Sequence, residues 1–329
     1  MKYNYVIFNS YGGKIGYKED EDYYVICLKD LEGRDDVIIN NYPLQDFSSL
    51  LLLLFRIHTH DVIGKFFRFI KKSYWYPYVF RNTFKDDKPI CFVCLRYPPV
   101  EYLKYLKSKY TNCKIVKLSR DLISTQKHLY DEYSQAKIFD LWMSYDKNDC
   151  AQYGFPHFDE FESKIDIPIG KNYPISDVFF VGRAKNRLKL ILDIYDKLTQ
   201  GGIKCLFYIV GAKDEEKAER EGVIYSEKPM TYKEMLEKTV NSRCLLDINQ
   251  KNAVGYTSRF LEAVMFNKML ITNCDSVKDS KYYDPKYIQI INSAEDVNVS
   301  LLNDNKDVNY HYDGEFSPVK RIELVDSLL

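Results

Sequence analysis

The chain has 329 residues, which exceeds the usual size of one compact core and predicts two domains of roughly 150 residues each. Lys and Arg together number 47, and Asp and Glu also number 47, so the formal net charge is zero. This balance excludes a whole-protein field of the kind that attracts nucleic acid, and we expect no nucleic-acid partner.

Short apolar runs alternate with amphipathic stretches through the first half of the chain. The apolar runs predict strands at Tyr5–Phe8, Tyr24–Leu28, Val37–Ile39, Ile90–Leu95, Lys114–Leu118 and Phe139–Ser144. The amphipathic stretches predict helices at Leu44–Arg56, Val100–Tyr110, Thr125–Ala136 and near Asn148–Tyr153. Leu50–Phe55 is the strongest apolar run. It is far shorter than the roughly 20 residues that cross a bilayer, and we interpret it as a buried helix face.

The second half continues the alternation with more regular spacing. Strands are expected at Val178–Val181, Cys205–Val210, Cys244–Ile248, Met269–Thr272 and Tyr287–Ile291. Helices are expected at Leu188–Leu198, Thr231–Thr239, Ser258–Asn267, Asp296–Leu302 and from Ser317 to the C-terminus. Continuous apolar strands are typical of parallel sheets buried on both faces, so each half predicts an α/β layer of Rossmann-like type.

These patterns divide the chain into three parts. We expect a first domain over residues 1–160, a second over 161–312, and a C-terminal helix over 313–329 that packs across the junction. The polar stretch 158–174 is the expected link between the domains. In a sheet of this kind, a ligand lies beyond the carboxyl ends of the strands.

The segment Val181–Arg187 places a cation directly after a strand. Arg183 is the strongest candidate for binding a diphosphate, because its guanidinium meets two phosphate oxygens at once and stays charged. Gly182 allows the backbone to approach a ligand closely. Lys185 and Arg187 have a simpler interpretation as solvated residues at a helix start, although cations there oppose the helix dipole.

A turn before the helix at 258–267 offers a second phosphate contact. Backbone N–H groups at a helix N-terminus bind phosphate, and the residues of this turn are Gly255, Tyr256, Thr257 and Ser258. Thr257 or Ser258 also suits a helix N-cap, and the two roles are compatible. Arg259 points either toward a diphosphate or to solvent, and Asn249 is a candidate contact for a base or sugar.

The two segments DVFFVGRAKNR and GYTSRFLEA, with WYPYVFRNTFKDDKPICF and KIFDLWMSYDKNDCAQYGF, resemble the GT-B glycosyltransferases of bacterial capsular and exopolysaccharide synthesis. The resemblance implies two tandem Rossmann-like domains with a cleft between them and a C-terminal helix crossing back. It implies a nucleotide-sugar donor on the second domain, with a UDP-sugar expected, and no cofactor. The first domain would hold a saccharide acceptor, which we expect to be lipid-linked.

Glu262 resembles the glutamate that accepts hydrogen bonds from the ribose hydroxyls of the donor in GT-B enzymes. The alternative is an ion pair with Arg259, three residues earlier on the same helix. In many retaining members a second glutamate lies eight positions before the ribose glutamate, and Val254 stands there in this chain. The departure favours an inverting displacement.

An inverting displacement uses a base, and a cluster in the first domain offers three candidates. His58 and His60 are imidazoles with a pKa near the working range, and Asp61 could orient one of them. A lone histidine is more often a structural hydrogen-bonding residue, so that alternative stays open. Asp121 and Asp20 are further candidates.

We expect no required metal. Cys91 and Cys94 lie on one strand without a second ligand pair, and the acidic run Glu19–Asp22 is better interpreted as a solvated loop before its strand. The eight cysteines show no paired framework, which fits a reducing compartment. No signal region is visible at Met1, so we expect a cytoplasmic protein.

The segment 64–85 combines cations and aromatic rings without an acidic residue. Its residues of these kinds are Lys65, Phe66, Phe67, Arg68, Phe69, Lys71, Lys72, Trp75, Tyr76, Tyr78, Phe80, Arg81 and Lys85. This composition suits the headgroup layer of an anionic membrane, so we expect peripheral contact at the inner face of the cell membrane. Some of these rings could instead belong to the core.

Two other functions stay open on the sequence. One is a transferase that moves a phosphosugar or polyol phosphate on the same scaffold. The other is a catalytically silent protein that binds a nucleotide sugar and supports a partner transferase.

Overall fold

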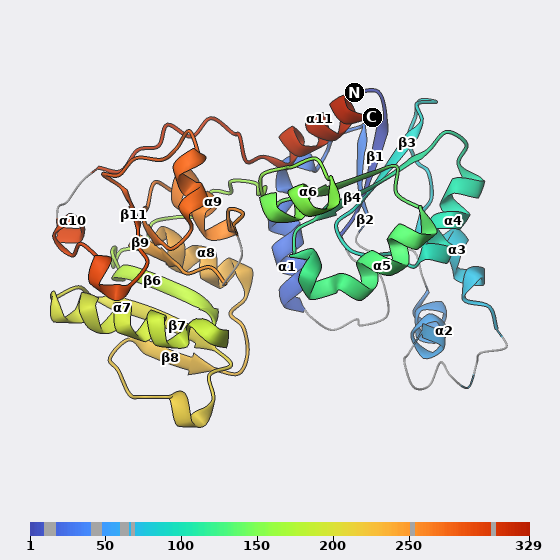
Figure 1. Ribbon diagram of the computed structural model, residues 1–329. Coiled ribbons are helices and arrows are strands. Elements are labelled where there is room, and N and C mark those ends of the chain that lie inside the picture. The colour runs from blue at the N-terminus through green and yellow to red at the C-terminus, as the bar shows by residue number, and fades with distance from the viewer. Residues whose placement is uncertain (10–17, 41–47, 60–65, 67–69, 251–253, 304–306) are drawn as a thin grey trace. The chain divides into compact units, whose positions relative to one another are not determined.

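A computed structural model describes the chain except for residues 10–17, 41–47, 60–65, 67–69, 251–253 and 304–306 (Figure 1). The chain forms two compact units. The first unit comprises Met1–Lys18, Leu28–Phe158 and Pro318–Leu329, and the second comprises Glu19–Cys27 and Asp159–Ser317. Each unit contains one parallel sheet with helices against it, which confirms the prediction of two parallel-sheet α/β domains.

The sheet of the first unit has five strands in the order β2-β1-β3-β4-β5, and all neighbours are parallel. The strands are β1 (Asn4–Phe8), β2 (Val37–Asn40), β3 (Ile90–Cys94), β4 (Lys114–Ser119) and β5 (Leu141–Ser144). In this order β2 lies on one side of β1, and β3, β4 and β5 follow on the other side. The strand predictions at these five positions are confirmed to within a few residues.

The first unit has six α-helices in its described residues. They are α2 (Ser49–Thr59), α3 (Tyr76–Val79), α4 (Val100–Lys109), α5 (Lys127–Ala136), α6 (Lys147–Tyr153) and the C-terminal α11 (Pro318–Leu328). Among these described helices, α2 contacts the segment around Trp75 rather than a strand. Buried side chains of α4 and α5 belong to the same hydrophobic cluster as Phe8 and Phe92, whose rings stack with centroids 5.6 Å apart. The α11 helix returns to the start of the chain, where Asp326 accepts hydrogen bonds from the Lys2 amide and the Tyr5 hydroxyl.

Two predictions in the first half are wrong. Tyr24–Leu28 is not a strand: α1 (Lys18–Cys27) is a helix grouped with the second unit. Tyr24, Cys27 and Leu28 are buried whereas Val25 is 46% exposed, which is helical spacing. The acidic run Glu19–Asp22 is therefore part of a helix rather than a loop.

The second wrong prediction concerns the face of α2. Phe55 is buried, but Leu50, Leu53 and Leu54 are 67%, 52% and 49% exposed. These three residues lie at positions i, i+3 and i+4 and so share one face of the helix. The run Leu50–Phe55 is helical as predicted, but much of its apolar side chain area is in contact with solvent. No helix in the described ranges is long and apolar enough to cross a membrane.

The sheet of the second unit has six parallel strands in the order β11-β10-β9-β6-β7-β8. The strands are β6 (Ser176–Arg183), β7 (Cys205–Val210), β8 (Val223–Ser226), β9 (Ser242–Asp247), β10 (Met269–Thr272) and β11 (Ile288–Ile290). Five of them match predicted strands. The sixth, β8, was missed because it is a short, half-exposed edge strand without a continuous apolar run.

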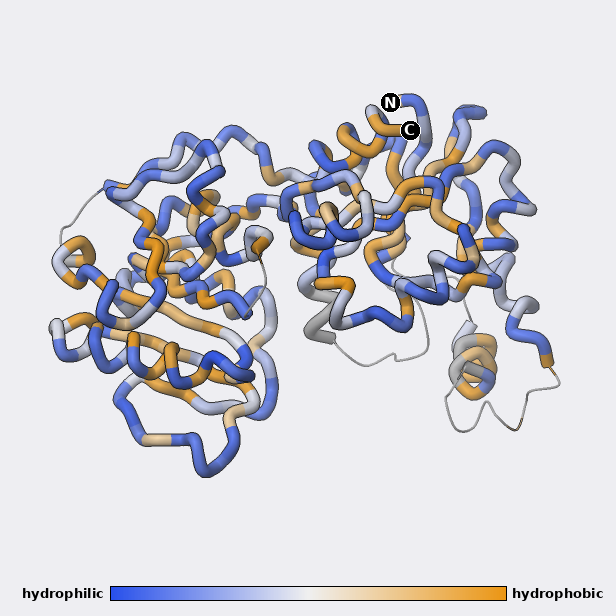
Figure 2. The backbone as a smooth tube through the Cα atoms, viewed as in Figure 1, coloured by the Kyte–Doolittle hydropathy of each residue, from blue (hydrophilic) through white to orange (hydrophobic). Residues whose placement is uncertain are grey.

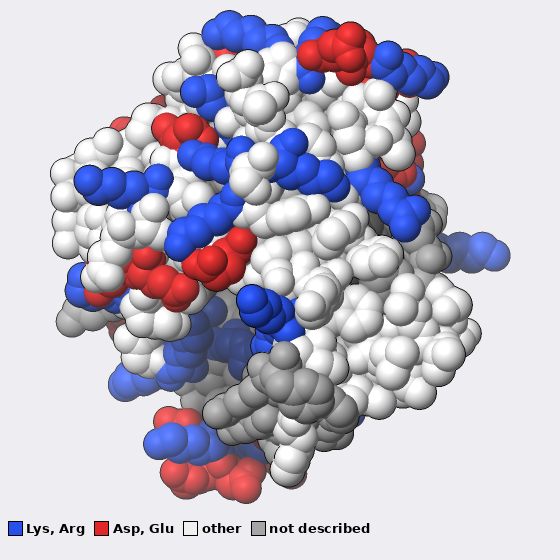
Figure 3. All heavy atoms as spheres, turned by 90° about the vertical axis from the view of Figure 1, so that its right-hand side faces the viewer, with Lys and Arg blue, Asp and Glu red and all other residues white. Residues whose placement is uncertain are grey.

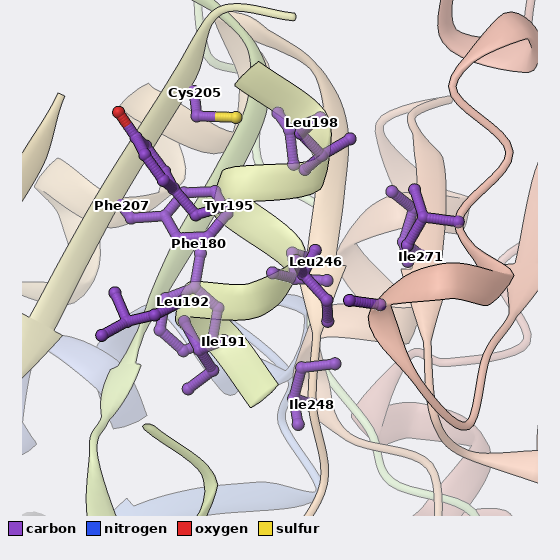
Figure 4. Packing of buried hydrophobic residues seen from close by; sticks show 14 of the residues in the cluster. Phe180, Ile191, Leu192, Tyr195, Leu198, Cys205, Phe207, Leu246, Ile248 and Ile271 are labelled. Atoms are coloured by element: carbon purple, nitrogen blue, oxygen red, sulfur yellow. The ribbon is translucent and has the colours of Figure 1, made fainter. Parts of the chain in front are cut away.

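Helices cover both faces of the second sheet. They are α7 (Leu188–Gln200), α8 (Tyr232–Val240), α9 (Ser258–Met265) and α10 (Ser300–Asn303). Alternate strand residues point to opposite faces: Phe180 and Leu246 join the cluster under α7 in Figure 4, and Phe179 and Leu245 join the cluster under α8 and α9. In Figure 2 the strands of both sheets are predominantly hydrophobic, as expected for strands buried on two faces.

One glycine of the second unit is fixed by a close backbone approach. Gly222 has φ +77°, and a Cβ there would overlap the carbonyl oxygen of Cys205. Gly202 has φ +78° with nothing within 4 Å of its Cβ position, so it is a matched control for conformational strain alone. We expect Gly222→Ala to lower the free energy of unfolding by about 2 kcal/mol more than Gly202→Ala. Urea denaturation measures both, and equal losses would contradict the close approach.

Candidate functional site

The order of strands in the second sheet reverses between β6 and β9. If β6 to β11 are numbered 1 to 6, their order across the sheet from β8 to β11 is 3-2-1-4-5-6. The chain therefore adds β7 and β8 on one side of β6, and then β9, β10 and β11 on the other side. Sheets with this order bind ligands in the crevice beyond the carboxyl ends of the two strands at the reversal. Here β6 ends at Arg183 and β9 ends at Asp247, so these two residues flank the expected position.

Arg183, the predicted diphosphate ligand, ends β6 with an exposed side chain. Its carbonyl accepts a hydrogen bond from the Arg187 Nε at 3.1 Å, so the backbone of the following turn is held while the guanidinium extends into solvent. An exposed cation at the carboxyl end of a central strand is well placed to meet an anion.

Arg187 has a different position from Arg183. Its guanidinium donates to the carbonyl of Ile248, just beyond the end of β9, as well as to the carbonyl of Arg183. Burial lowers its pKa, and a Cβ on Gly182 would lie 3.2 Å from its Nη2. Arg187 therefore ties the ends of β6 and β9 together, which neither of the sequence-based interpretations of this residue anticipated. Lys185, at the start of the same turn, is exposed with φ +43°.

Asp247 was missed by the sequence analysis. It is only 6% exposed, and burial raises its pKa. Its Oδ2 accepts a hydrogen bond from the Thr257 hydroxyl at 2.8 Å, with the Thr272 hydroxyl at 3.4 Å. The available signal was a single acidic residue at the end of the apolar run CLLDI. Asp247 therefore fixes the turn that precedes α9 to the end of the central strand.

The predicted turn is present at the start of α9. Thr257 is the N-cap, and its hydroxyl accepts from the Arg259 amide at 3.2 Å while donating to Asp247. Ser258 is the first helical residue and is half-buried, and its amide lies at the helix start. The next two amides after Arg259, those of Phe260 and Leu261, donate to the Thr257 carbonyl at 3.1 and 3.4 Å. Tyr256 is buried in the core, where its ring centroid lies 4.8 Å from that of Phe260 and burial raises its pKa to about 12.

Asn249 and Gly255 brace the same loop. The Asn249 amide donates to the Asn273 side chain at 2.6 Å, and its own Nδ2 donates to the Gly255 carbonyl at 3.5 Å. Asn249 is 6% exposed. The structure thus gives Asn249 a role in joining the ends of β9 and β10, and contact with a base or sugar stays a prediction.

Arg259 and Glu262 form the ion pair that was the alternative to ribose binding. The Arg259 Nη1 contacts the Glu262 Oε2, and Glu262 is completely buried. The Tyr232 hydroxyl lies 3.3 Å from the Glu262 Oε1, and the Thr239 hydroxyl lies 3.5 Å from its Oε2. Burial raises the pKa of Glu262 to about 7, against the opposing effect of Arg259. Both carboxylate oxygens have protein partners, and the ribose role stays a prediction.

Of the three predicted bases, only His58 lies within the described residues. It is buried on α2, and both ring nitrogens are hydrogen-bonded. The Trp75 indole N–H donates to Nδ1 at 2.7 Å, so Nε2 carries the hydrogen and donates to the Ile70 carbonyl at 2.9 Å. His58 thus has the structural role that was its alternative interpretation. His60 and Asp61 fall outside the described residues, and their catalytic role stays a prediction.

The described residues contain no cluster of potential metal ligands and no disulfide. Within the described ranges, no three or more His, Cys, Asp or Glu side chains are grouped so that they could hold a metal ion. All eight cysteines are free, and seven of them are buried.

No family model matches the chain, and no curated protein matches it. Among solved structures, it is similar to the trehalose-6-phosphate synthase OtsA at 10% identity and a TM-score of 0.47, covering 91% of this chain and 90% of that one. It is similar to the lipopolysaccharide outer core galactosyltransferase WaaB at 14% identity and a TM-score of 0.41, covering 91% and 88%.

A third structure, a mutant of S. aureus TarM in complex with fondaparinux, alpha-GlcNAc-glycerol and UDP, matches at 11% identity and a TM-score of 0.43. The match covers 66% of this chain and 49% of TarM, so this chain spans about half the length of that protein. Likenesses this distant assign no substrate. The α/β assignment rests on the topology of the two sheets.

Proposed function

We propose that this chain is a glycosyltransferase that moves a sugar from a nucleoside-diphosphate donor, a UDP-sugar, to a saccharide acceptor in surface polysaccharide synthesis. The observation that carries the proposal is the strand reversal between β6 and β9, flanked by the exposed cation Arg183 and the N-terminus of α9. A departing diphosphate needs positive charge and N–H donors at a fixed place, and these groups supply both.

Each described residue has a definite part in this proposal. Arg183 would bind the diphosphate, and the Ser258 amide at the start of α9 would donate to it. Asp247 and Thr257 would hold that helix start in place through their hydrogen bond, and Arg187 would keep the ends of β6 and β9 together. The resemblance of GYTSRFLEA to the nucleotide loop of GT-B enzymes supports the same position for the donor.

A thermal-shift panel of UDP, GDP, CDP and dTDP tests the proposal. A ligand at 100 times its dissociation constant stabilises a protein by about 2.7 kcal/mol, which raises the melting temperature measurably. We expect a shift with UDP, and stabilisation by none of the four would contradict the proposal. Transfer from UDP-sugars in the presence of EDTA, with NMR of the product anomer, then tests the proposed metal-independent inverting displacement.

The occupied ring of His58 favours a second candidate function, a nucleotide-sugar-binding protein without transfer activity. A general base needs a free lone pair, and the Trp75 indole already donates to the lone pair of His58 Nδ1. Donor hydrolysis in the absence of acceptor distinguishes the two. Hydrolysis that disappears in Arg183→Ala supports the transferase. UDP-sugar binding without hydrolysis or transfer supports the silent protein.

We also propose that the first unit contacts an anionic membrane that presents a lipid-linked acceptor. The apolar face of α2, formed by Leu50, Leu53 and Leu54, is exposed, and Phe66 is 78% exposed. Exposed cations follow in the same segment, namely Lys71, Lys72, Arg81 and Lys85. Figure 3 shows Lys and Arg side chains beside uncharged surface on a face of the first unit. Apolar residues next to cations suit the headgroup layer.

Not all of the basic-aromatic segment faces solvent. Phe80 is 3% exposed and packs on Phe92 with ring centroids 5.3 Å apart. Trp75 packs on Phe55 at 5.2 Å. Of the described rings, Phe66, Tyr74 and Tyr78 are exposed and therefore available for a membrane.

We expect the triple substitution Leu50→Ser, Leu53→Ser and Leu54→Ser to weaken binding to phosphatidylglycerol vesicles by at least about tenfold, because it removes apolar area that would enter the bilayer. Co-sedimentation measures the effect. Ile224→Ser, at a 45% exposed position on β8 of the second unit, is the control and should bind like wild type. Equal binding of the triple variant and wild type would contradict the membrane proposal.

A further inference from the structure

A buried cluster beneath the start of α9 joins two carboxyl groups through one tyrosine. The Tyr232 hydroxyl donates to the Glu162 Oε1 and lies 3.3 Å from the Glu262 Oε1. Glu162, from the segment before β6, and Glu262, on α9, are both completely buried. A phenol has one proton to donate, so it satisfies one carboxylate fully and the other at the longer distance.

Arg259 is the cation that the described part of the chain places against Glu262. Its side chain is 11% exposed and lies on the first turn of α9, next in sequence to Ser258, whose amide is proposed to bind a diphosphate. Among the described residues its side chain also contacts the Thr239 hydroxyl at 3.2 Å and the Met235 sulfur, which carry no charge, and its own charge opposes the burial that raises the pKa of Asp247. A diphosphate at the helix start carries more negative charge than one carboxylate and would compete for this guanidinium.

The groups that face Glu262 come from every element packed around it. They are Arg259 on α9 itself, Tyr232 on α8, Asp247 on β9 and Glu162 before β6, while Tyr23 on α1 packs against Tyr232 with ring centroids 4.7 Å apart. Tyr232, Asp247, Glu162 and Glu262 are all buried, and all four are acidic or phenolic groups. If Arg259 moves away, the charged form of Glu262 loses its strongest stabilising contact.

We propose that binding of a nucleoside diphosphate at the N-terminus of α9 draws Arg259 away from Glu262 and is accompanied by the uptake of one proton from solvent onto the Glu262 carboxylate. This coupling rests on the proposed function. Burial raises the pKa of Glu262 to about 7 even with Arg259 in place, which agrees with proton uptake by this carboxylate when Arg259 moves away. Withdrawal of the cation raises this pKa further, so at pH 8 the carboxylate is ionised before binding and protonated afterwards.

Isothermal titration calorimetry with UDP tests the coupling directly. Titrations at pH 8 in phosphate, HEPES and Tris buffers give the number of protons taken up from the slope of observed enthalpy against buffer ionisation enthalpy. At this pH the terminal phosphate of UDP is already fully ionised, because its second pKa is about 6. We expect an uptake of about 0.5 to 1 proton per UDP bound in the wild type.

Three variants locate the proton. In Glu262→Gln the uptake should fall to zero, because the accepting carboxylate is gone. In Glu162→Gln it should be reduced, because removal of a neighbouring like charge lowers the proton affinity of Glu262. Glu215→Gln, at an exposed position of the second unit, should match the wild type. If Glu262→Gln does not fold, the proton uptake of Glu162→Gln tests the coupling: a reduced uptake supports it and an unchanged uptake contradicts it.

The outcomes separate this coupling from the proposed function. UDP binding with no proton uptake in the wild type overturns the coupling and leaves the binding site intact. An uptake that persists unchanged in Glu262→Gln also overturns it. If none of UDP, GDP, CDP and dTDP binds, the proposed function and the coupling both fail.

Discussion

Arg183→Ala is expected to weaken UDP binding about 30- to 100-fold, which corresponds to about 2 to 3 kcal/mol. The guanidinium ends β6 at the strand reversal and is exposed, so the proposal makes it the main cation for the diphosphate. Its side chain extends into solvent, and the melting temperature without ligand should therefore change little. Calorimetric titration of UDP and a thermal melt of the free protein measure the two quantities.

Lys189→Ala is the matched control for this experiment. Lys189 lies six residues later on α7, and its ammonium pairs with Asp193 at 2.6 Å on a solvent-exposed surface. Its removal should leave UDP affinity unchanged within about twofold, because an exposed ion pair contributes little. Equal effects of Arg183→Ala and Lys189→Ala on UDP affinity would show that the diphosphate is not bound at the end of β6.

Arg259→Ala should destabilise the protein by about 3 to 5 kcal/mol at pH 8, because it breaks a buried ion pair and the Glu262 carboxyl must then hold a proton at a pH well above its ordinary pKa. The loss should be smaller at pH 6. Glu262 has a folded-state pKa of about 7, above its ordinary value of 4.5, and removal of Arg259 raises it further. Its contribution to stability is therefore fully present below about pH 4.5 and falls as the pH rises through the folded-state value. Urea denaturation at the two pH values measures both effects.

Two further variants show whether the loss of stability in Arg259→Ala comes from the buried Glu262 carboxyl. Adding Glu262→Gln to Arg259→Ala should recover part of the stability at pH 8, because a neutral glutamine needs no proton from solvent at that position. Arg243→Ala removes a guanidinium from an ion pair with Asp177 whose arginine is 39% exposed, and it should cost at most about 1 kcal/mol. A loss in Arg259→Ala that is independent of pH would contradict the account of the cluster.

The sequence predicted the fold well where the strands are buried on both faces. Runs such as CLFYIV and MLIT are apolar throughout and match β7 and β10 residue for residue. The prediction failed at Tyr24–Leu28, where an apolar run of strand-forming residues follows KEDED and belongs to one helix. The contacts that make this helix favourable, such as Tyr23 against Tyr232, join residues over 200 positions apart, and local propensity does not contain them.

The candidate site was predicted only in part, because some of its contacts join residues that are distant in the sequence. Arg183 and the turn before α9 follow from their position after a strand and before a helix, which is local information. Asp247 and Arg187 act across strands, and their partners Thr257 and Ile248 become neighbours only once the sheet order is known. Whether Arg259 and Glu262 face a ligand or each other depends on the burial of Glu262, which the sequence pattern does not specify.

The central claim is that the second unit binds the diphosphate of a nucleotide sugar beyond the carboxyl ends of β6 and β9. A crystal structure with UDP tests it most directly. The account predicts diphosphate density in contact with the Arg183 guanidinium and with the Ser258 amide at the start of α9. UDP bound elsewhere on the chain, or an empty position there after soaks with UDP, GDP, CDP and dTDP, would contradict it.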